Sequence, residues 1–188
     1  LVASPSVAAP AISQVAENTG KLEVSADADK AFQTIKGEGF EVQFDMKQGT
    51  INKLVYGGES VIVPGYGPRL NAFRAFVSND NWCYQPWFAN GLHNLKHHAE
   101  NAQVIKEKNG NVKITCTVVS QAPNAARLQS KNGRYDSGIH TLEENTDRPF
   151  GADDFKFTTN QIWTIYPDGS IELQAAITSN NPGIVLAR

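Results

Sequence analysis

The chain has 188 residues, of which 40% are hydrophobic and 19% charged, and its formal net charge is −2 at pH 7. This composition is typical of a globular domain, and the balanced charge argues against a nucleic-acid binder, which needs clustered positive charge. No apolar run approaches the roughly 18–20 residues that span a bilayer, so we expect no membrane partner either. The two cysteines, Cys83 and Cys116, permit one disulfide at most and leave the redox compartment open.

Residues 1–30 differ in composition from the rest of the chain. The first 16 residues are rich in alanine, serine and proline, and no lysine or arginine precedes Lys21. A secretory signal needs a basic start and a continuous apolar core, which Pro5 and Pro10 interrupt. The segment is therefore predicted to be a linker or extended lead-in, with strand-like alternation starting near Leu22 and Val24.

From Ala31 onward the pattern favours β-strands. Phe40, Val42 and Phe44 alternate with polar residues, as in a strand with one buried face. Similar segments, separated by turn signals such as Asn109-Gly110, are predicted at 50–56, 104–108, 112–118, 161–166 and 171–177. Only residues 85–97 favour a helical turn or two, so the sequence predicts an all-β sandwich.

The segment from Ala122 to Asp154 is long, polar and rich in turn residues. Structureless loops of such length are uncommon in compact domains. We therefore interpret residues 122–154 as a long loop or insertion, in which Asn132-Gly133 favours a small exposed hairpin.

The titratable residues form no convincing catalytic or metal-binding pattern. Glu143 and Glu144 are adjacent, as are the aspartates of 153–154, but neighbours on an extended strand face opposite ways, so both pairs are interpreted as solvated charges. His93 and His97 would share a face on a helix, yet no third ligand lies nearby, which favours a structural role. Cys83 has no orienting partner for a nucleophile, and Cys116 lies in a period-two series that predicts a buried thiol.

The densest polar-aromatic stretch runs from Asn71 to Trp82 and continues through Tyr84 and Trp87. Aromatic rings beside amides, carboxylates and guanidinium groups are typical of sugar sites, where rings stack and planar polar groups bind hydroxyls. A core strand that ends in an Asx-rich turn explains the same residues. From spacing alone both interpretations stand.

At this stretch the sequence resembles a known family. Phe40–Asp45, Gly49–Leu54 and Gly57-Gly58 resemble the opening of the C-terminal small-chain domain of bacterial β-galactosidases of glycoside hydrolase family two. That family continues with a segment close to Asn-x-x-Arg-Ala-Pro-x-Asp-Asn-Asp. Matching residues stand here in the same order, at Asn71, Arg74, Ala75, Asn79 and Asp80, with departures at Phe76, Ser78 and Asn81.

Later landmarks extend the resemblance from about Lys36 to Arg188. Trp87, Gly91-Leu92 and the Tyr166–Ile171 turn resemble family positions, and Leu186–Arg188 resembles the start of its Pro-Arg-Ile-Gly signature. The resemblance implies a galactose-mutarotase-like antiparallel β-supersandwich over 31–188. We expect this chain to hold only the N-terminal portion of that domain.

The resemblance also implies where function lies. In the family, the acid/base and nucleophile glutamates belong to a (β/α)8 barrel, so no catalytic residue is expected in this chain. The segment after Asn79-Asp80 corresponds to a loop near the mouth of the barrel's active site. Arg74, Asn79, Asp80 and Trp82 are therefore the candidates for loop-organising or substrate-side residues: Asn79 and Asp80 through bonds to backbone, and Arg74 through a bidentate pair with a carboxylate.

The leading hypothesis is a fragment of a retaining β-galactosidase that caps and shapes the active site without doing the chemistry. The implied partners are a β-galactoside substrate and the barrel, in a homo-oligomeric bacterial parent of the cytoplasm or periplasm. Mg and Na ions would be bound in the parent's other domains, with no metal or cofactor in this piece. Two alternatives are a free-standing aldose-epimerase-like enzyme, which needs a His and a Glu on one sugar, and a non-catalytic carbohydrate-binding or structural module with Trp82, Tyr84 and Trp87 as its platform.

Overall fold

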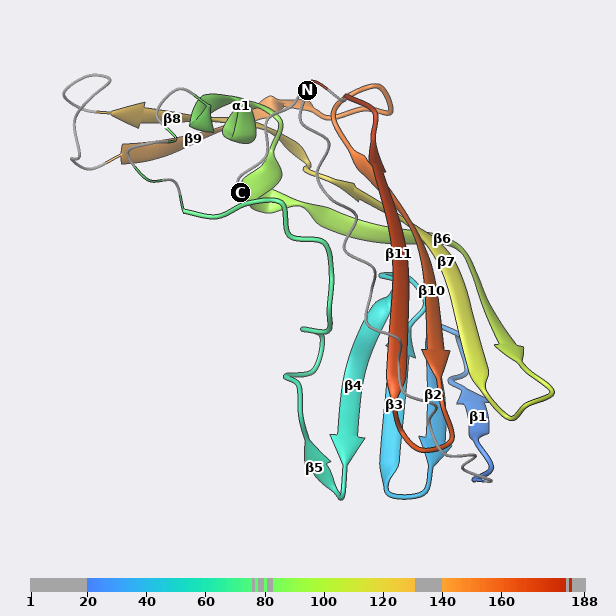
Figure 1. Ribbon diagram of the computed structural model, residues 1–188. Helices are drawn as coiled ribbons and strands as arrows, with labels where there is room; N and C mark the ends of the chain where they lie inside the picture. Colours follow the sequence, from blue (N-terminus) through green and yellow to red (C-terminus); the bar gives the residue numbers. More distant parts are fainter. Residues whose placement is uncertain are drawn as a thin grey trace, which may run out of the picture.

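A computed structural model describes residues 20–75, 77, 80, 83–130, 140–181 and 183 (Figure 1). Most of the predicted lead-in, the Asn132-Gly133 turn and Leu186–Arg188 therefore lie outside the described residues. Within them the regular secondary structure is almost entirely antiparallel strand, which confirms the all-β sandwich. Two sheets face each other, and a smaller two-stranded sheet lies at one end of the molecule (Figure 1).

The first sheet has five strands in sequence order: β1 (Glu23–Ala26), β2 (Phe32–Gly37), β3 (Phe40–Asp45), β4 (Thr50–Tyr56) and β5 (Glu59–Ser60). The second sheet has the order β11 (Ile171–Ser179), β10 (Phe157–Ile165), β7 (Val112–Gln121) and β6 (Lys96–Lys106). The third pairs β8 (Asn124–Ser130) with β9 (His140–Pro149). β1 pairs with β2, so the first sheet begins before Ala31, where the sequence pattern first becomes strongly β-like.

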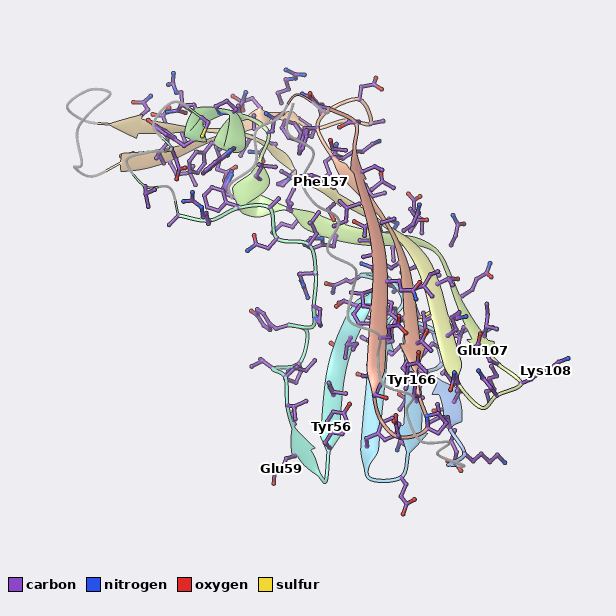
Figure 2. The ribbon with its side chains drawn as sticks, viewed as in Figure 1. Tyr56, Glu59, Glu107, Lys108, Phe157 and Tyr166 are labelled. Atoms are coloured by element: carbon purple, nitrogen blue, oxygen red, sulfur yellow. The ribbon has the colours of Figure 1, made fainter. Side chains whose placement is uncertain are left out.

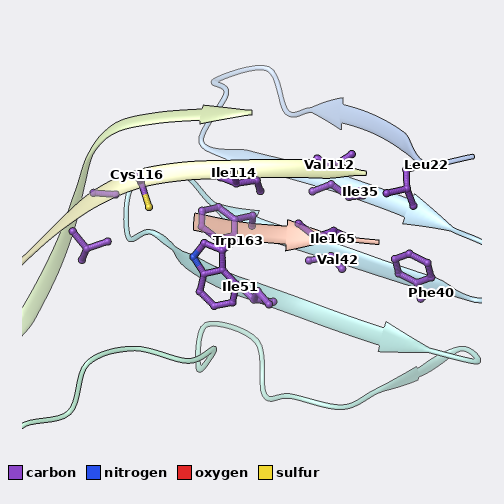
Figure 3. Close-up of a cluster of buried hydrophobic side chains, with 13 residues drawn as sticks. Leu22, Ile35, Phe40, Val42, Ile51, Val112, Ile114, Cys116, Trp163 and Ile165 are labelled. Carbon is purple, nitrogen blue, oxygen red and sulfur yellow. The ribbon is translucent and has the colours of Figure 1, made fainter. Parts of the chain in front are cut away.

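The facing sides of the two large sheets form a hydrophobic cluster, which we call the sandwich core. Its members come mainly from β2, β3 and β4 on one side and from β7 and β10 on the other (Figure 3). Phe44 is fully buried and meets the Trp163 ring edge to face, with centroids 5.7 Å apart. Burying a side chain of this size contributes roughly 1.5–3 kcal/mol, so this cluster accounts for much of the stability of the sandwich.

Cys116 lies in this core, as the period-two pattern of β7 predicts. Its Sγ lies 3.6 Å from Gln161 Oε1, which also accepts a hydrogen bond from Trp163 Nε1 at 2.9 Å. Burial raises the pKa of the Cys116 thiol to about 11. The thiol is therefore protonated at neutral pH and serves packing rather than chemistry.

The prediction of one or two helical turns within residues 85–97 is confirmed. The helix α1 (Tyr84–Ala89) ends early, a short 3₁₀ turn η2 (Leu92–Asn94) follows, and β6 begins at Lys96. Gly91 separates the two, with a left-handed φ of 69°, and a Cβ at that position would collide with Ala122. Glycine is favoured here because it adopts positive φ without steric cost. His97 therefore lies on a strand, so His93 and His97 do not share a helical face.

Residues 122–154 contain a sheet where a long loop or insertion was predicted. β8 and β9 pair in antiparallel fashion and lie beside α1 (Figure 1). The Gln85 side-chain amide donates to the Leu128 carbonyl at 2.8 Å, which attaches the helix to β8. The segment is thus a structured part of the domain within its described residues.

A second cluster of buried side chains lies at this end of the molecule, and we call it the aromatic core. It comprises Cys83, Tyr84, Trp87, Phe88, Leu92, Ala126, Phe155 and Phe157, with Phe73 among the half-buried residues packed on it. Figure 2 places Phe157 near α1, whereas Tyr166 and Tyr56 lie toward the opposite end of the long strands. Strand β10 therefore runs from one core to the other.

Candidate functional site

A strap without regular secondary structure, residues 61–75, runs from β5 toward α1 (Figure 1). Thr50 on β4 donates its hydroxyl to the Pro68 carbonyl at 2.6 Å and so fixes the middle of the strap to the sandwich. The end of the strap packs on the aromatic core through Leu70, Ala72 and Phe73. Arg74 follows directly, so the strap delivers this residue to a defined place.

Arg74 forms a bidentate ion pair with Asp80. Its Nη1 donates to Asp80 Oδ2 at 2.7 Å, and its Nη2 donates to Asp80 Oδ1 at 3.0 Å. Two parallel bonds fix the relative orientation of the guanidinium and carboxylate planes, which one bond cannot do. The Arg74 guanidinium also lies 5.8 Å from the centroid of the buried Trp87 ring, a cation–π distance.

Asp80 also organises the backbone around it. The Val77 N–H donates to Asp80 Oδ2 at 2.8 Å, and two backbone bonds, from Asp80 N–H to the Val77 carbonyl and from Cys83 N–H to the Asp80 carbonyl, continue the turn toward α1. The Val77 N–H, followed by Arg74, lowers the pKa of Asp80, so the carboxylate is ionised at neutral pH. We call residues 74, 75, 77, 80 and 83 the polar turn.

Two of the four candidate residues, Asn79 and Trp82, lie outside the described residues. The structure brings the other two, Arg74 and Asp80, together in one ion pair. A substrate-side role for all four stays a prediction. Burial raises the pKa of the adjacent Cys83 thiol, so this cysteine is not poised as a nucleophile.

The aromatic residues that follow do not form an exposed platform. Tyr84 and Trp87 are 5% and 1% exposed, and both belong to the aromatic core. The prediction that Tyr84 and Trp87 form a binding platform was therefore wrong. The competing interpretation, a core strand ending in a turn, is wrong about the strand, because residues 61–75 have no strand geometry and the buried Tyr84 and Trp87 lie on α1.

Sequence reasoning missed a polar contact between distant residues, His93 and Glu144. His93 Nε2 lies 3.1 Å from Glu144 Oε1, and Asn124 Nδ2 donates to Glu144 Oε2 at 2.5 Å. The bond from His93, followed by that from Asn124, lowers the pKa of Glu144. Glu144 is thus no isolated solvated charge, in contrast to the prediction for this pair. Its neighbour Glu143 bonds the exposed Arg127 instead.

Register explains how a polar contact arises across 51 residues. Glu144 lies opposite Ala126 in the β8–β9 ladder, and Ala126 belongs to the aromatic core that also contains Leu92. The only signal in the sequence was the Asn132-Gly133 turn, which favours a hairpin but leaves its exact register undetermined. A shallow pocket of about 410 Å³ lies beside this contact, lined by Ala89, Ala125, Ala126, Arg127, Glu143, Glu144 and Asn145.

Two of the remaining histidines, His97 and His98, lie on β6. On β6, His97 Nδ1 lies 2.9 Å from Ser120 Oγ, and burial lowers the pKa of His97, so its ring is neutral at pH 7. His98 lies on the same strand, and the side chain of His140 is outside the described part of the chain. Among the residues that the structure describes, no three His, Cys, Asp or Glu side chains converge as a metal site would require. In the same part of the chain no helix is long and apolar enough to cross a membrane.

The fold and the polar turn define the class first: an antiparallel β-sandwich domain that presents an internally fixed turn at one end. Residues 36–188 match the family of the β-galactosidase small chain, and the chain belongs to that family. Membership implies a glycoside hydrolase as the parent protein. A comparison with curated protein sequences finds no significant match.

Proposed function

We propose that this chain is the front part of the C-terminal domain of a bacterial family-two β-galactosidase, which hydrolyses terminal β-D-galactosides with retention. In this proposal the domain, of galactose-mutarotase type, caps and shapes the active site. The catalytic acid/base and nucleophile glutamates lie in a (β/α)8 barrel outside this chain. The family match over residues 36–188 supports the assignment, together with the landmark residues that lie in the family's order.

The observation that carries the proposal is the Arg74–Asp80 pair and its bond to the Val77 N–H. An active site gains from a turn that already has its bound geometry, because ordering it then costs no binding energy. A bidentate pair that also holds backbone provides such a preformed turn. In the sequence the candidate Asn79 directly precedes Asp80, and Trp82 follows two residues after it.

The adjacent Glu143 and Glu144 do not resemble a retaining pair. Retention needs two carboxyl groups about 5–5.5 Å apart, both facing the glycosidic bond. Glu143 and Glu144 occupy adjacent positions on β9 and bond different partners, Arg127 on β8 and His93 after α1. The Glu144–His93 contact also disfavours the epimerase alternative, since His93 bonds the carboxylate and its side chain is only 9% exposed.

The other parts of the proposal concern the parent enzyme. Its substrate is a β-galactoside, its Mg and Na ions belong to domains outside this chain, and it assembles as a homo-oligomer. Neither a nucleic acid nor a membrane takes part, in keeping with the net charge of −2.

Arg74→Ala in the complete enzyme tests the proposal. We expect kcat/KM for a chromogenic β-galactoside to fall at least about 10-fold, because losing one side of a charge-assisted pair removes roughly 1.5–3 kcal/mol. Arg74→Lys is expected to restore little, since lysine lacks the planar fork. Arg148→Ala is the matched control, because Arg148 pairs with Asp154 but its side chain is 75% exposed. Unchanged kinetics in Arg74→Ala, or robust hydrolysis by the 188-residue chain alone, would contradict the proposal.

A further inference from the structure

We propose that His93, held by Glu144, is a positioning residue for the polar turn, and that the β8–β9 sheet therefore takes part in shaping the active site. This inference rests on the proposed function for its catalytic consequence. Its structural part, a link from β9 through His93 to the turn, stands on contacts within the domain.

The first step of the link is the packing between His93 and the strap. The His93 ring lies 6.1 Å from the Phe73 ring and 5.1 Å from the Phe88 ring, measured between centroids. Phe73 also packs edge to face on Trp87 and Phe88. Because Phe73 is bonded to Arg74 through one peptide unit, a shift of the His93 ring displaces the residue that anchors the polar turn.

The second step is the hydrogen bond that orients the ring. An ionised carboxylate only accepts, so His93 Nε2 carries the proton and donates to Glu144 Oε1. The other ring nitrogen, His93 Nδ1, is buried with no hydrogen-bond partner. The bond to Glu144 is thus the one polar contact of the ring that the described residues provide. Without it, packing alone would define how the ring sits between Phe73 and Phe88.

The third step is the support behind Glu144. Its other oxygen accepts from Asn124 Nδ2, whose residue begins β8 and is 7% exposed. Both oxygens are therefore occupied, by residues on two different elements. The carboxylate joins β8, β9 and the turn after α1 at one point, which gives His93 a rigid partner rather than a mobile surface charge.

Glu143 offers an internal comparison for the same strand. It is adjacent to Glu144 on β9, and its Oε2 accepts bonds from Arg127 and Gln129 on β8. These bonds are solvent-exposed and involve no residue of the aromatic core. Removing the Glu143 carboxylate thus changes the charge of β9 as much as removing that of Glu144, but leaves the link to the strap intact.

The kinetic consequence depends on the fraction of enzyme molecules in which the polar turn has its binding geometry. When only a fraction of molecules holds the turn in its binding geometry, the apparent dissociation constant rises by the inverse of that fraction. Chemistry in the molecules that do bind is unchanged. A loss of the His93–Glu144 bond is therefore expected to raise KM and spare kcat.

The test measures amide hydrogen exchange in the full chain for wild type, Glu144→Ala and Glu143→Ala. The reporters are the N–H groups of Val77, Asp80 and Cys83, each of which has a hydrogen bond within the polar turn. We expect these to exchange at least about 10-fold faster in Glu144→Ala, while the amides of Ile35 and Val42 in the sandwich core keep their rates. Glu143→Ala is expected to leave both sets unchanged. Equal acceleration in both sets, or none in the turn, overturns the proposal.

A second variant, His93→Phe, keeps a ring between Phe73 and Phe88 but removes the donor. It is expected to reproduce the exchange pattern of Glu144→Ala, and wild-type exchange in the turn would overturn the role of the bond. In the complete enzyme both variants are expected to raise KM about 5–10-fold with kcat within about two-fold. The two proposals fail differently: if Arg74→Ala leaves the kinetics intact, the proposed function fails, whereas the exchange result decides the His93 link by itself.

Discussion

The sandwich core and the aromatic core are built on different principles. In the sandwich core, strands contribute every second residue, and the facing sheets bury aliphatic and aromatic groups such as Val42, Ile114 and Trp163. In the aromatic core, rings from the strap and a six-residue helix pack on one another and on the ring of His93, and Ala126 and Leu128 of the two-stranded sheet pack against them. The first cluster repeats a regular geometry, and the second joins irregular pieces by specific contacts.

This difference separates stability from positioning. Regular sheets bury large areas with backbone hydrogen bonds already satisfied, so the sandwich is expected to dominate the free energy of unfolding. Irregular segments can present side chains in geometries that no strand offers, but they need ion pairs and ring contacts to hold them. The polar turn lies on the second kind of structure, next to Trp87 and Phe73.

The largest expected effect is a cavity in the sandwich core. Phe44→Ala removes a fully buried ring that packs on Trp163, and we expect the free energy of unfolding to fall by about 3–5 kcal/mol. Urea unfolding of the chain measures this. The control Ile177→Ala, at a side chain 51% exposed on β11, is expected to change it by less than about 0.5 kcal/mol. A loss below about 1 kcal/mol for Phe44→Ala would mean that the sandwich core does not dominate stability.

A smaller loss of stability is expected from a substitution in the β3–β4 turn, which packs against β7 of the second sheet. Gly49 has a φ of 68°, and an added Cβ would collide with Val118 on β7. Gly49→Ala is expected to cost about 2–4 kcal/mol, from strain and overpacking together. Gly58 also has positive φ, yet nothing lies within 4 Å of an added Cβ. Gly58→Ala thus isolates the strain, about 1 kcal/mol, and equal losses in the two variants would show that packing under β7 contributes nothing.

The same contrast explains what the sequence predicts well. Alternation over β3, β7 and β10 identifies the inward faces because one strand face is buried along its whole length. The Asn109-Gly110 turn follows from local chemistry: Gly110 has a φ of 90°, and Asn109 accepts a bond from the Asn111 N–H. These signals depend only on residues close together in the sequence. They can therefore be recognised without knowledge of the fold.

The aromatic core and its contacts could not be predicted in this way. The side chains of β9 are exposed at 141–149, and β6 contributes only Ala99, Ala102 and Val104 to the sandwich core, with a register shift between Glu100 and Gln103 that interrupts its period. The Arg74–Asp80 pair spans six residues and was anticipated only as an unspecified carboxylate partner for Arg74. The His93–Glu144 contact spans 51 residues and depends on the register of a hairpin whose second strand, β9, shows no buried face at 141–149.

The smallest expected effect is a change in stability at acidic pH. It arises from the ionised Glu144 carboxylate beside the aromatic core. The pKa of Glu144 is lower in the folded chain than its ordinary value, mainly because His93 bonds its ionised form. A depressed folded pKa gives stability that is present above the unfolded value, about 4.3, and is lost as pH falls through the folded value. Glu144→Gln should therefore destabilise the chain near pH 6, by about 1 kcal/mol after solvent screening. The penalty should shrink toward zero as pH falls through the lowered folded pKa of Glu144.

Urea unfolding of wild type and Glu144→Gln between pH 3 and 7 measures this difference, with Glu143→Gln as the control. Glu143 bonds an Arg127 side chain that is 66% exposed, so its replacement is expected to stay within about 0.5 kcal/mol at every pH. A Glu144→Gln penalty that is constant across the range would assign the loss to packing rather than to the ionised carboxylate. Ring contacts alone would then order the aromatic core. The two cores would differ in packing geometry, and the Glu144 charge would contribute nothing to that difference.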